Sequence, residues 1–382
     1  MNVVAQSEAT TIRRETAPGI SAVRIVSPAY QELYLSLFPI PGENVSKMIS
    51  RLAEALKACD AVIVRHEVFG SLSARAETIQ ALEGEFENVD WPITWVEGAA
   101  AAAVPVEGMH LFAIAGIPVE TLYEDGRPIG RTFDDGDFRH CLLGDLRPTK
   151  LDVSKGEQSL EVFEQLERML GAVNMDMSHV MRTWFFLEDL LAWYGTFNEV
   201  RNKFYGEKKM SNGFMPASTG IGGRNPGGGA IVAGAWAVSA TGPHATVREI
   251  ASPLQCSATN YGSAFSRAIV LESPGAKKIM VSGTASIDPD GRSVRIGDLA
   301  GQLETSFDVV KAILISEGFG FDDVSRATGY FKPGQDGSQC RSDLRWLGMP
   351  GLRVHADICR PELLFEIELD AVLSAPGNFR KA

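Results

Sequence analysis

Apolar and polar positions alternate most regularly close to the C-terminal end of the chain. Residues 365–370 read FEIELD, so an apolar side chain occupies every second position. This two-residue period predicts a β-strand with one buried face, and it places Glu366 on the other face together with two further acids. Three acids on one face are typical of a solvated surface. The alternative is a cleft, where burial disfavours the charged form of a carboxyl group and lets it act as a general acid.

The same reading along the whole chain gives strands and helices in a recurring order. Strands are predicted over 22–39, 61–69, 110–122, 179–187, 230–238, 278–287, 324–331 and 365–372, and helices over 45–58, 158–170, 190–205 and 302–317. The order strand, helix, strand occurs three times, which indicates an internal repeat. Tyr194 and Tyr205 lie on nearly one face of the helix over 190–205 and are expected to pack in the core.

Two of these units match where the helix joins the following strand. Residues 175–189, MDMSHVMRTWFFLED, resemble residues 320–334, GFDDVSRATGYFKPG, when Val180 is set against Val324 and Arg182 against Arg326. Residues 52–71, LAEALKACDAVIVRHEVFGS, look like a degenerate copy. The sequence therefore predicts two clear α+β repeats and one eroded repeat.

These matches suggest how the chain is divided. We expect an N-terminal lobe over 1–242 and a C-terminal domain over 243–382 that carries Glu366. Within the lobe, a degenerate repeat is expected over about 20–108 and a second repeat over about 109–240.

The composition restricts the class of protein and its partners. Hydrophobic residues make up 45% of the 382 residues and charged residues 22%, which is typical of a globular chain. A formal net charge of −12 makes nucleic acid or an anionic membrane an unsuitable partner. An anionic substrate would therefore need local arginines to bind it.

The positions of cysteine and histidine argue against disulfides and metal sites. The cysteines are Cys59, Cys141, Cys256, Cys340 and Cys359, an odd number without a CxxC pair, and the six histidines form no HxH or HxxxH pair. This usage fits a reducing compartment. No apolar run approaches the roughly 20 residues of a membrane span, and the first residues lack the apolar stretch of a signal peptide. We expect a cytoplasmic protein without a metal.

The C-terminal unit resembles the RidA/YjgF family. The resemblance rests on IMVSGTASIDPDG, QLETSFDVVKAILISEGFGFDDVSRATGYFKP and LLFEIELDAV within residues 278–372. The middle unit, about 110–238, is similar less closely, most visibly in DLLAWYGTFNEVRNKFY followed by MPAS. RidA proteins are homotrimers of one such domain with active sites between subunits. The resemblance implies an α+β fold of fused RidA/YjgF-like (chorismate-mutase-like) repeats, with mixed sheets, helices packed on one face and a pseudo-trimeric arrangement.

Three segments, PASTGIGG, NYGSAFSRA and HADICRPELLFEIE, resemble the chorismatases, which remove the enolpyruvyl group of chorismate. The resemblance implies that Glu366 is the general acid that protonates the methylene carbon of the enol ether. Cys359 stands where chorismatases that make 3-hydroxybenzoate have a cysteine, whereas the hydrolysing kind has a smaller apolar residue. A buried cysteine that only fills space is the alternative.

Arginines are the expected partners of the two carboxylates of chorismate, because they offer a matching bidentate geometry. Arg353 lies near the position of the carboxylate-binding arginine of RidA, although its spacing to the FEIE strand is shorter by a couple of residues. Arg267, Arg224 and Arg182 are the next candidates, and each could instead form a structural salt bridge. Ser218 occupies the corresponding position of the middle unit, which predicts one competent site per chain.

Together these features predict a cofactor-free chorismate lyase of the 3-hydroxybenzoate synthase type, which releases pyruvate. The substrate's own 4-hydroxyl would displace pyruvate, and exclusion of water would decide between this route and hydrolysis to a dihydroxycyclohexadiene carboxylate. A RidA-like imine deaminase and a non-catalytic small-molecule-binding protein are further alternatives. Because the repeats are fused, we expect a monomer or a weak homodimer.

Overall fold

Three sheets with the same connectivity form the part of the chain that the structure describes. This computed structural model describes residues 10–98, 105–208, 214–335 and 348–374. The sheets have the strand orders β1-β2-β3-β6-β4-β5, β7-β8-β9-β12-β10-β11 and β13-β14-β15-β18-β16-β17. The last two strands of each order are parallel, and the other neighbours are antiparallel. The expected fold class of fused α+β repeats is therefore confirmed. Cys340 lies outside the described residues.

The first unit has this complete topology, although its sequence matches the other two poorly. Its strands are β1 (Thr11–Ala17), β2 (Ile20–Val26), β3 (Gln31–Leu37), β4 (Val62–Gly70), β5 (Ile93–Val96) and β6 (Val106–Ala115). Its helices are α1 (Val45–Lys57), the short η1 (Leu72–Ala74) and α2 (Arg75–Glu85). The segment that reads as a degenerate copy is thus eroded in sequence and intact in structure.

The second and third units repeat the same plan. The second contains β7 (Glu120–Glu124), β8 (Arg127–Asp134), β9 (Phe138–Leu146), α3 (Lys155–Gly171), η2 (Met177–His179), β10 (Val180–Leu187), α4 (Leu190–Glu207), β11 (Ala217–Gly222) and β12 (Ile231–Ala240). The third contains β13 (Thr246–Ile250), η3 (Ala258–Tyr261), β14 (Ala268–Glu272), β15 (Ala276–Ala285), α5 (Leu299–Ser316), η4 (Phe321–Asp323), β16 (Val324–Phe331), β17 (Gly351–His355) and β18 (Phe365–Ser374).

Helices α1, α3 and α5 begin at polar residues whose side chains cap them. The Asn44 side chain accepts a hydrogen bond from the backbone N–H of Lys47 at 3.0 Å at the start of α1. Ser154 and Glu157 form a capping box at the start of α3. Within the described ranges, no helix combines the length and apolar character that would let it cross a membrane.

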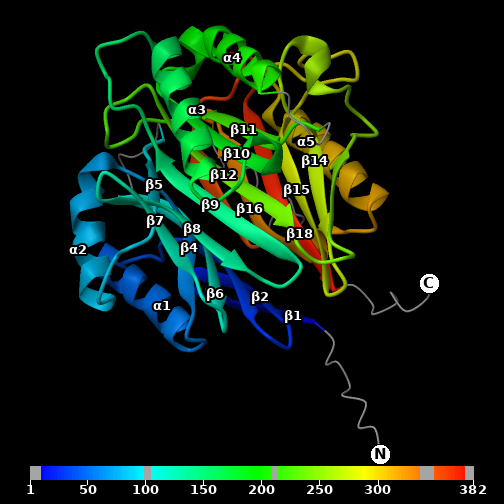
Figure 1. Cartoon of the computed structure of the whole chain (residues 1–382). Coiled ribbons are helices and arrows are strands. Elements are labelled where there is room, and N and C mark those ends of the chain that lie inside the picture. The colour runs from blue at the N-terminus through cyan, green and yellow to red at the C-terminus, as the bar shows by residue number, and fades with distance from the viewer. Residues whose placement is uncertain (1–9, 99–104, 209–213, 336–347, 375–382) are drawn as a thin grey trace, which may run out of the picture.

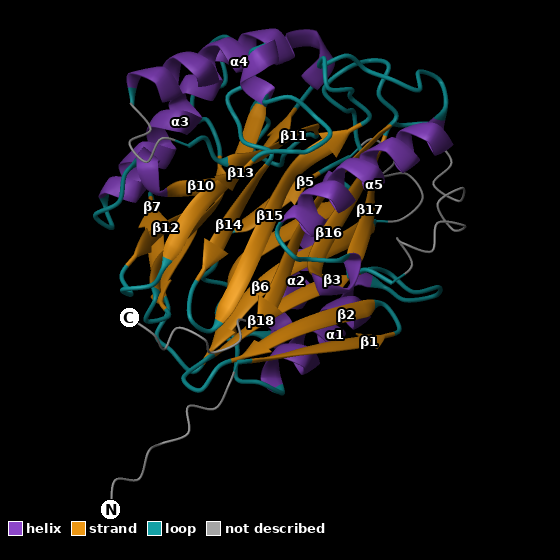
Figure 2. Ribbon diagram, turned by 90° about the vertical axis from the view of Figure 1, so that its right-hand side faces the viewer, coloured by secondary structure: helices purple, strands orange, loops and turns teal. Residues whose placement is uncertain are grey.

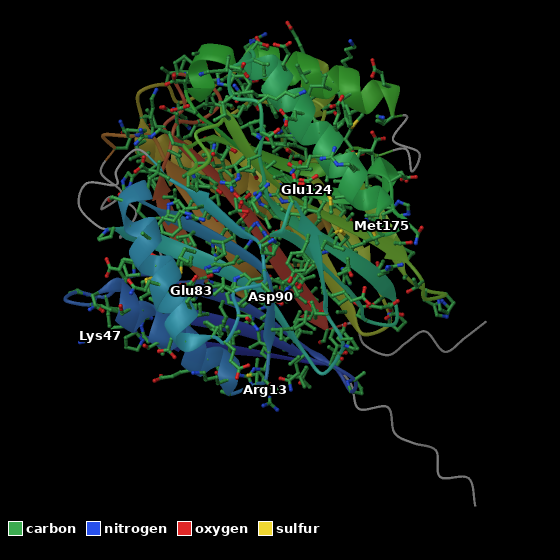
Figure 3. All side chains as sticks on the ribbon, turned by 60° about the vertical axis from the view of Figure 1, so that its left-hand side comes forward. Arg13, Lys47, Glu83, Asp90, Glu124 and Met175 are labelled. Carbon is green, nitrogen blue, oxygen red and sulfur yellow. The ribbon has the colours of Figure 1, made fainter. Side chains whose placement is uncertain are left out.

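The helices cover the outer faces of the sheets, and the inner faces meet at the centre (Figures 1 and 2). Separate apolar clusters join α1 and α2 to the first sheet, α3 and α4 to the second, and α5 to the third. Lys47 and Glu83 project from α1 and α2 towards solvent (Figure 3). A further cluster combines residues from all three sheets, including Tyr34, Trp236 and Leu352. Three like units around one shared core are the expected pseudo-trimeric arrangement.

Most of the predicted elements agree with the structure, and two strands are corrected. The strand predicted over 110–122 consists of the end of β6 and the start of β7, because the chain turns at Gly116 with a φ of +91°. β6 pairs with β3 and β4 and so belongs to the first sheet. The strand predicted over 22–39 is the hairpin of β2 and β3.

Candidate active site

A cavity of about 180 Å³ lies at the seam between the second and third units. One wall comes from α4 and β11, and the other from β15, β18 and the adjoining loops. Its chemically active lining includes Glu366, Cys359 and three arginines. The cavity therefore lies between two of the repeats.

Glu366 is the buried carboxyl of this cavity. Its neighbours Phe365 and Ile367 pack against α5, so Glu366 faces away from the helix, and only 5% of the residue is exposed. Burial raises its pKa to about 8, and the charge of Glu368 adds to this rise against two nearby arginines. The carboxyl therefore carries its proton at neutral pH and can donate it. All three acids on this face of β18 are buried, so the solvated-face alternative is wrong.

The backbone of β15 makes room for this carboxyl. A Cβ on Gly283 would overlap Oε1 of Glu366, so the absence of a side chain at this position allows the close approach. The backbone N–H of Gly283 donates to the hydroxyl of Thr219 on β11 at 3.1 Å. The acid therefore lies where the second and third units are tied together.

Cys359 lines the cavity as a neutral thiol. Burial raises its pKa to about 12, and the nearby Glu366 contributes to this rise. A thiol with such a pKa is not ionised at neutral pH and so lacks the character of a nucleophile. The position suits a group that shapes the space beside the acid, and its effect on the product stays a prediction.

Arg267 is the predicted arginine that the structure does bring to the cavity. It directly precedes β14, and its Nε and Nη2 donate to the carbonyl of Cys256 at 3.0 and 2.8 Å. Its guanidinium carbon lies 5.6 Å from the ring centre of Tyr261. These contacts hold the cation in place on the cavity wall.

Two arginines that the sequence reasoning missed complete the cationic lining. Arg201 of α4 donates from Nη2 to Asn198 at 2.6 Å, and its buried Nε has no hydrogen-bond partner among the described residues. Arg360 donates from Nη1 to the carbonyl of Gly291 at 3.0 Å and to the hydroxyl of Ser293 at 3.1 Å. Three guanidinium groups therefore line a cavity in a chain whose overall charge is negative.

Arg182 and Arg224, by contrast, lie outside the cavity lining and form salt bridges. Arg182 is fully buried at the centre of the molecule, where it pairs with Glu368. Arg224 pairs with Glu97, and its side chain is 60% exposed. Both arginines therefore form structural salt bridges. The structure does not support the prediction that they contact the substrate.

Arg353 also lies outside the cavity lining. It alternates along β17 with Leu352 and Val354, which belong to the central core, so its side chain occupies the other face of the sheet. β17 itself packs beside β6, at the seam between the third and first units. The position predicted from the spacing in RidA therefore belongs to a different seam from the one that holds Glu366.

The equivalent positions in the other two units carry no acid. The pairs β10–β12, β4–β6 and β16–β18 share one register shift, and they can be aligned on it. This alignment places Val232 of β12 and Gly108 of β6 at the position that Glu366 occupies in β18. Leu352 fills the space beside Gly108, since a Cβ there would lie 2.6 Å from its Cδ2 atom. These replacements support the prediction of one competent site per chain.

Aromatic side chains also line the cavity. Tyr194, Tyr261 and Phe265 are part of its lining. Tyr205 packs in the core of the second unit as predicted, whereas Tyr194 from the same helix reaches the cavity. Burial raises the pKa of Tyr194, so its phenol stays neutral. Within the described ranges, no three His, Cys, Asp or Glu side chains are grouped so as to hold a metal ion.

Comparison with solved structures identifies the architecture. The crystal structure of a chorismatase matches with a TM-score of 0.62 and 21% sequence identity, over 88% of this chain and 98% of that one. The chain has the chorismatase fold.

Shorter solved structures match about a third of the chain. A putative endoribonuclease from Thermotoga maritima matches with 26% identity and a TM-score of 0.27, over 33% of this chain and 97% of that one. A member of the YjgF protein family from Neisseria meningitidis matches with 18% identity and a TM-score of 0.27, over 33% and 98%. No protein-family model and no curated protein matches the chain.

Proposed function

We propose that this protein removes the enolpyruvyl group of chorismate and releases pyruvate together with 3-hydroxybenzoate, without a cofactor. The observation that carries the proposal is Glu366, a buried carboxyl with a raised pKa in a cavity lined by three arginines. Chorismate needs both features, because it is a dianion with an enol ether that must be protonated on carbon. The chorismatase fold is consistent with this reading.

Arg201, Arg267 and Arg360 supply the positive charge for the two carboxylates of the substrate. A planar guanidinium can donate two parallel hydrogen bonds to a carboxylate, and the interaction is stronger away from bulk water. The buried Nε of Arg201 is a donor without a partner among the described residues, so a carboxylate oxygen would satisfy it. This local charge offsets the formal net charge of −12 of the chain.

The proposed reaction begins with transfer of the Glu366 proton to the methylene carbon of the enolpyruvyl group. The resulting oxocarbenium-like centre makes pyruvate a good leaving group. The 4-hydroxyl oxygen attacks C3 as the bond from C3 to the ether oxygen breaks, and the hydroxyl proton is lost. The epoxide then opens as its oxygen takes up one of the released protons, the ring loses a proton to become aromatic, and Glu366 takes up the other. No water is consumed.

Cys359 supports the aromatic product over hydrolysis. Its neutral thiol lines the wall that also carries Glu366, where it fills space that a reacting water would need. Hydrolysis to a dihydroxycyclohexadiene carboxylate is the second candidate. It is favoured by the polar groups of Asn198, Ser218 and Ser263 in the same lining, which can hold a water molecule.

Incubation of the purified protein with chorismate, followed by chromatographic identification of pyruvate and the ring product, tests the proposal. Equal amounts of pyruvate and 3-hydroxybenzoate support it, and pyruvate with a non-aromatic diene diol indicates hydrolysis. Ammonia release from an imine without pyruvate from chorismate would indicate a RidA-like deaminase. Binding of chorismate without turnover would indicate a binding protein.

The proposal includes a monomer or a weak homodimer in a cytoplasmic setting. The three units of one chain already surround a shared core and form the seam that holds the cavity, so the site needs no second copy. Size exclusion with light scattering measures the mass, and a stable trimer would contradict this part of the proposal.

A further inference from the structure

Glu368 is a second buried acid on β18, and its carboxylate is held by six donors. Oε2 accepts hydrogen bonds from Arg182, Thr219 and Trp184, and Oε1 accepts from Arg326 at 2.7 Å and from Thr328 and Tyr330 at 3.3 Å. Burial alone would raise the pKa of Glu368, but Arg326 and Arg182 hold it well below its usual range. The group is therefore a fixed negative charge.

The surroundings of Glu368 come from all three units, which makes this charge immobile. Arg65, Arg182 and Arg326 occupy equivalent register positions in β4, β10 and β16. Their guanidinium carbons lie 3.4, 4.7 and 5.6 Å from the ring centre of Trp184. A carboxylate anchored in this central cluster cannot swing away when the neighbouring cavity fills or empties.

Glu366 lies two residues from Glu368 on the same face of β18, so the two positions are about 7 Å apart along the strand. Glu366 points into the cavity, whereas Glu368 points into the central cluster. A fixed negative charge at that separation opposes ionisation of Glu366, which would place a second negative charge close by.

The other groups that face Glu366 act differently. Arg267 before β14 and Arg182 on β10 favour its ionised form. Arg201 on α4 and Arg360 add positive charge to the cavity lining. The remaining titratable groups of the lining, the thiol of Cys359 and the phenols of Tyr194 and Tyr261, have pKa values that burial raises, so they stay neutral. Glu368 thus supplies the negative charge that counters these cations.

We propose that Glu368 is a positioning residue for the proposed reaction, and that its fixed charge keeps Glu366 protonated and ready to donate despite the arginines that bind the substrate. Without it, the nearby cations would ionise a larger share of the acid at neutral pH, against the effect of burial. The catalytic consequence rests on the proposed function, whereas the protonation of Glu366 can be measured without any substrate.

The test is a pH titration of Glu366 in the substrate-free, full-length protein. Carbon-13 NMR of labelled glutamate carboxyls monitors the titration. The Glu366 signal is assigned by its loss in Glu366→Gln. In Glu368→Gln, the midpoint of this signal should fall by about one pH unit, because a nearby negative charge is removed. An unchanged midpoint in the folded variant would overturn the proposal.

Two further variants make the result specific. Arg182→Gln removes a positive charge near the acid and should move the midpoint in the opposite direction, to higher pH. Tyr330→Phe removes one donor to Glu368 without changing a charge and should leave the midpoint in place. If Glu368→Gln does not fold, the wild-type protein and Arg182→Gln still test the proposal. A wild-type midpoint near that of an ordinary glutamate would overturn it, and so would an Arg182→Gln midpoint that does not move to higher pH.

The pH profile of pyruvate release from chorismate then links the titration to turnover. Since the reaction needs protonated Glu366, the basic limb of the profile should shift by the same amount and in the same direction as the NMR midpoint. A wild-type protein that releases no pyruvate would contradict the proposed function and leave the titration as the test of Glu368. A shifted midpoint with an unshifted basic limb would overturn the catalytic role of Glu368.

Discussion

The backbone of Gly283 lies so close to the side chain of Glu366 that a Cβ on Gly283 would overlap the Oε1 atom. The two residues belong to the neighbouring strands β15 and β18, which pair in an antiparallel manner. The carboxyl of Glu366 can therefore occupy its observed position only because residue 283 on the adjacent strand is a glycine.

Gly283→Ala should slow pyruvate release from chorismate. The added methyl group pushes the carboxyl out of its place, and a shift of this size in a reacting group lowers the rate by about 100-fold. Gly84→Ala is the matched control, because Gly84 lies on α2 with open space around its Cβ position. Equal rates for the two variants would contradict the placement of the acid.

Glu366→Gln should be more stable than the wild type, by a margin that grows with pH. The pKa of Glu366 is about 8 in the folded protein and about 4.3 in the unfolded chain, so the folded wild type loses stability as pH rises between these values. The variant lacks this loss. The difference in unfolding free energy should grow by about 1.4 kcal/mol per pH unit from pH 5 to 8 and then level off.

Urea denaturation of both proteins at pH 5, 6, 7 and 8 measures this difference. The sign is diagnostic, because a glutamate held in a salt bridge has a lowered pKa and would make the substituted protein less stable as pH rises. A difference that is constant with pH would show that Glu366 titrates normally.

Arg201→Gln should weaken substrate binding. The buried guanidinium is proposed to bind a carboxylate, and loss of one such charged hydrogen bond raises KM by about 10- to 100-fold. Arg224→Gln is the control: Arg224 was a candidate from sequence, but the structure places its exposed side chain against Glu97. A larger effect in Arg224→Gln than in Arg201→Gln would reverse the two assignments.

Cys359→Ala should change the product more than the rate. The smaller side chain leaves space for a water molecule beside the acid, so part of the 3-hydroxybenzoate should be replaced by the hydrolysis product. Chromatography of the ring products measures the ratio, with Cys59→Ala in the first unit as the control. The same ratio in both variants would show that Cys359 does not determine the product.

The sequence was sufficient to predict β18, because the alternation of FEIELD is local. It could not show that the acidic face is buried, since that depends on groups brought in from another sheet and from the neighbouring strand β16. Arg182 comes from β10 and Arg326 from β16, both far away along the chain. The buried acids therefore had the pattern of a solvated face.

The sequence analysis selected Arg353 and missed Arg201, and both errors could partly have been avoided. The two-residue period of β17 puts Arg353 on the face opposite Leu352 and Val354, and this could be deduced from the sequence alone. Arg201 lies four residues after Phe197 on the apolar side of its helix, which is a signal for a buried cation. Its convergence with Glu366 still required the structure, because the seam joins two units.

The central claim is that Glu366 protonates chorismate in a reaction that releases pyruvate. The most direct test compares the wild type with Glu366→Gln, which keeps the shape of the side chain but carries no transferable acidic proton, in an assay of pyruvate and 3-hydroxybenzoate formed from chorismate. The account predicts equal amounts of both products from the wild type and a rate lowered by at least about 100-fold in the variant. Turnover by Glu366→Gln close to that of the wild type, or no pyruvate from either protein, would contradict it.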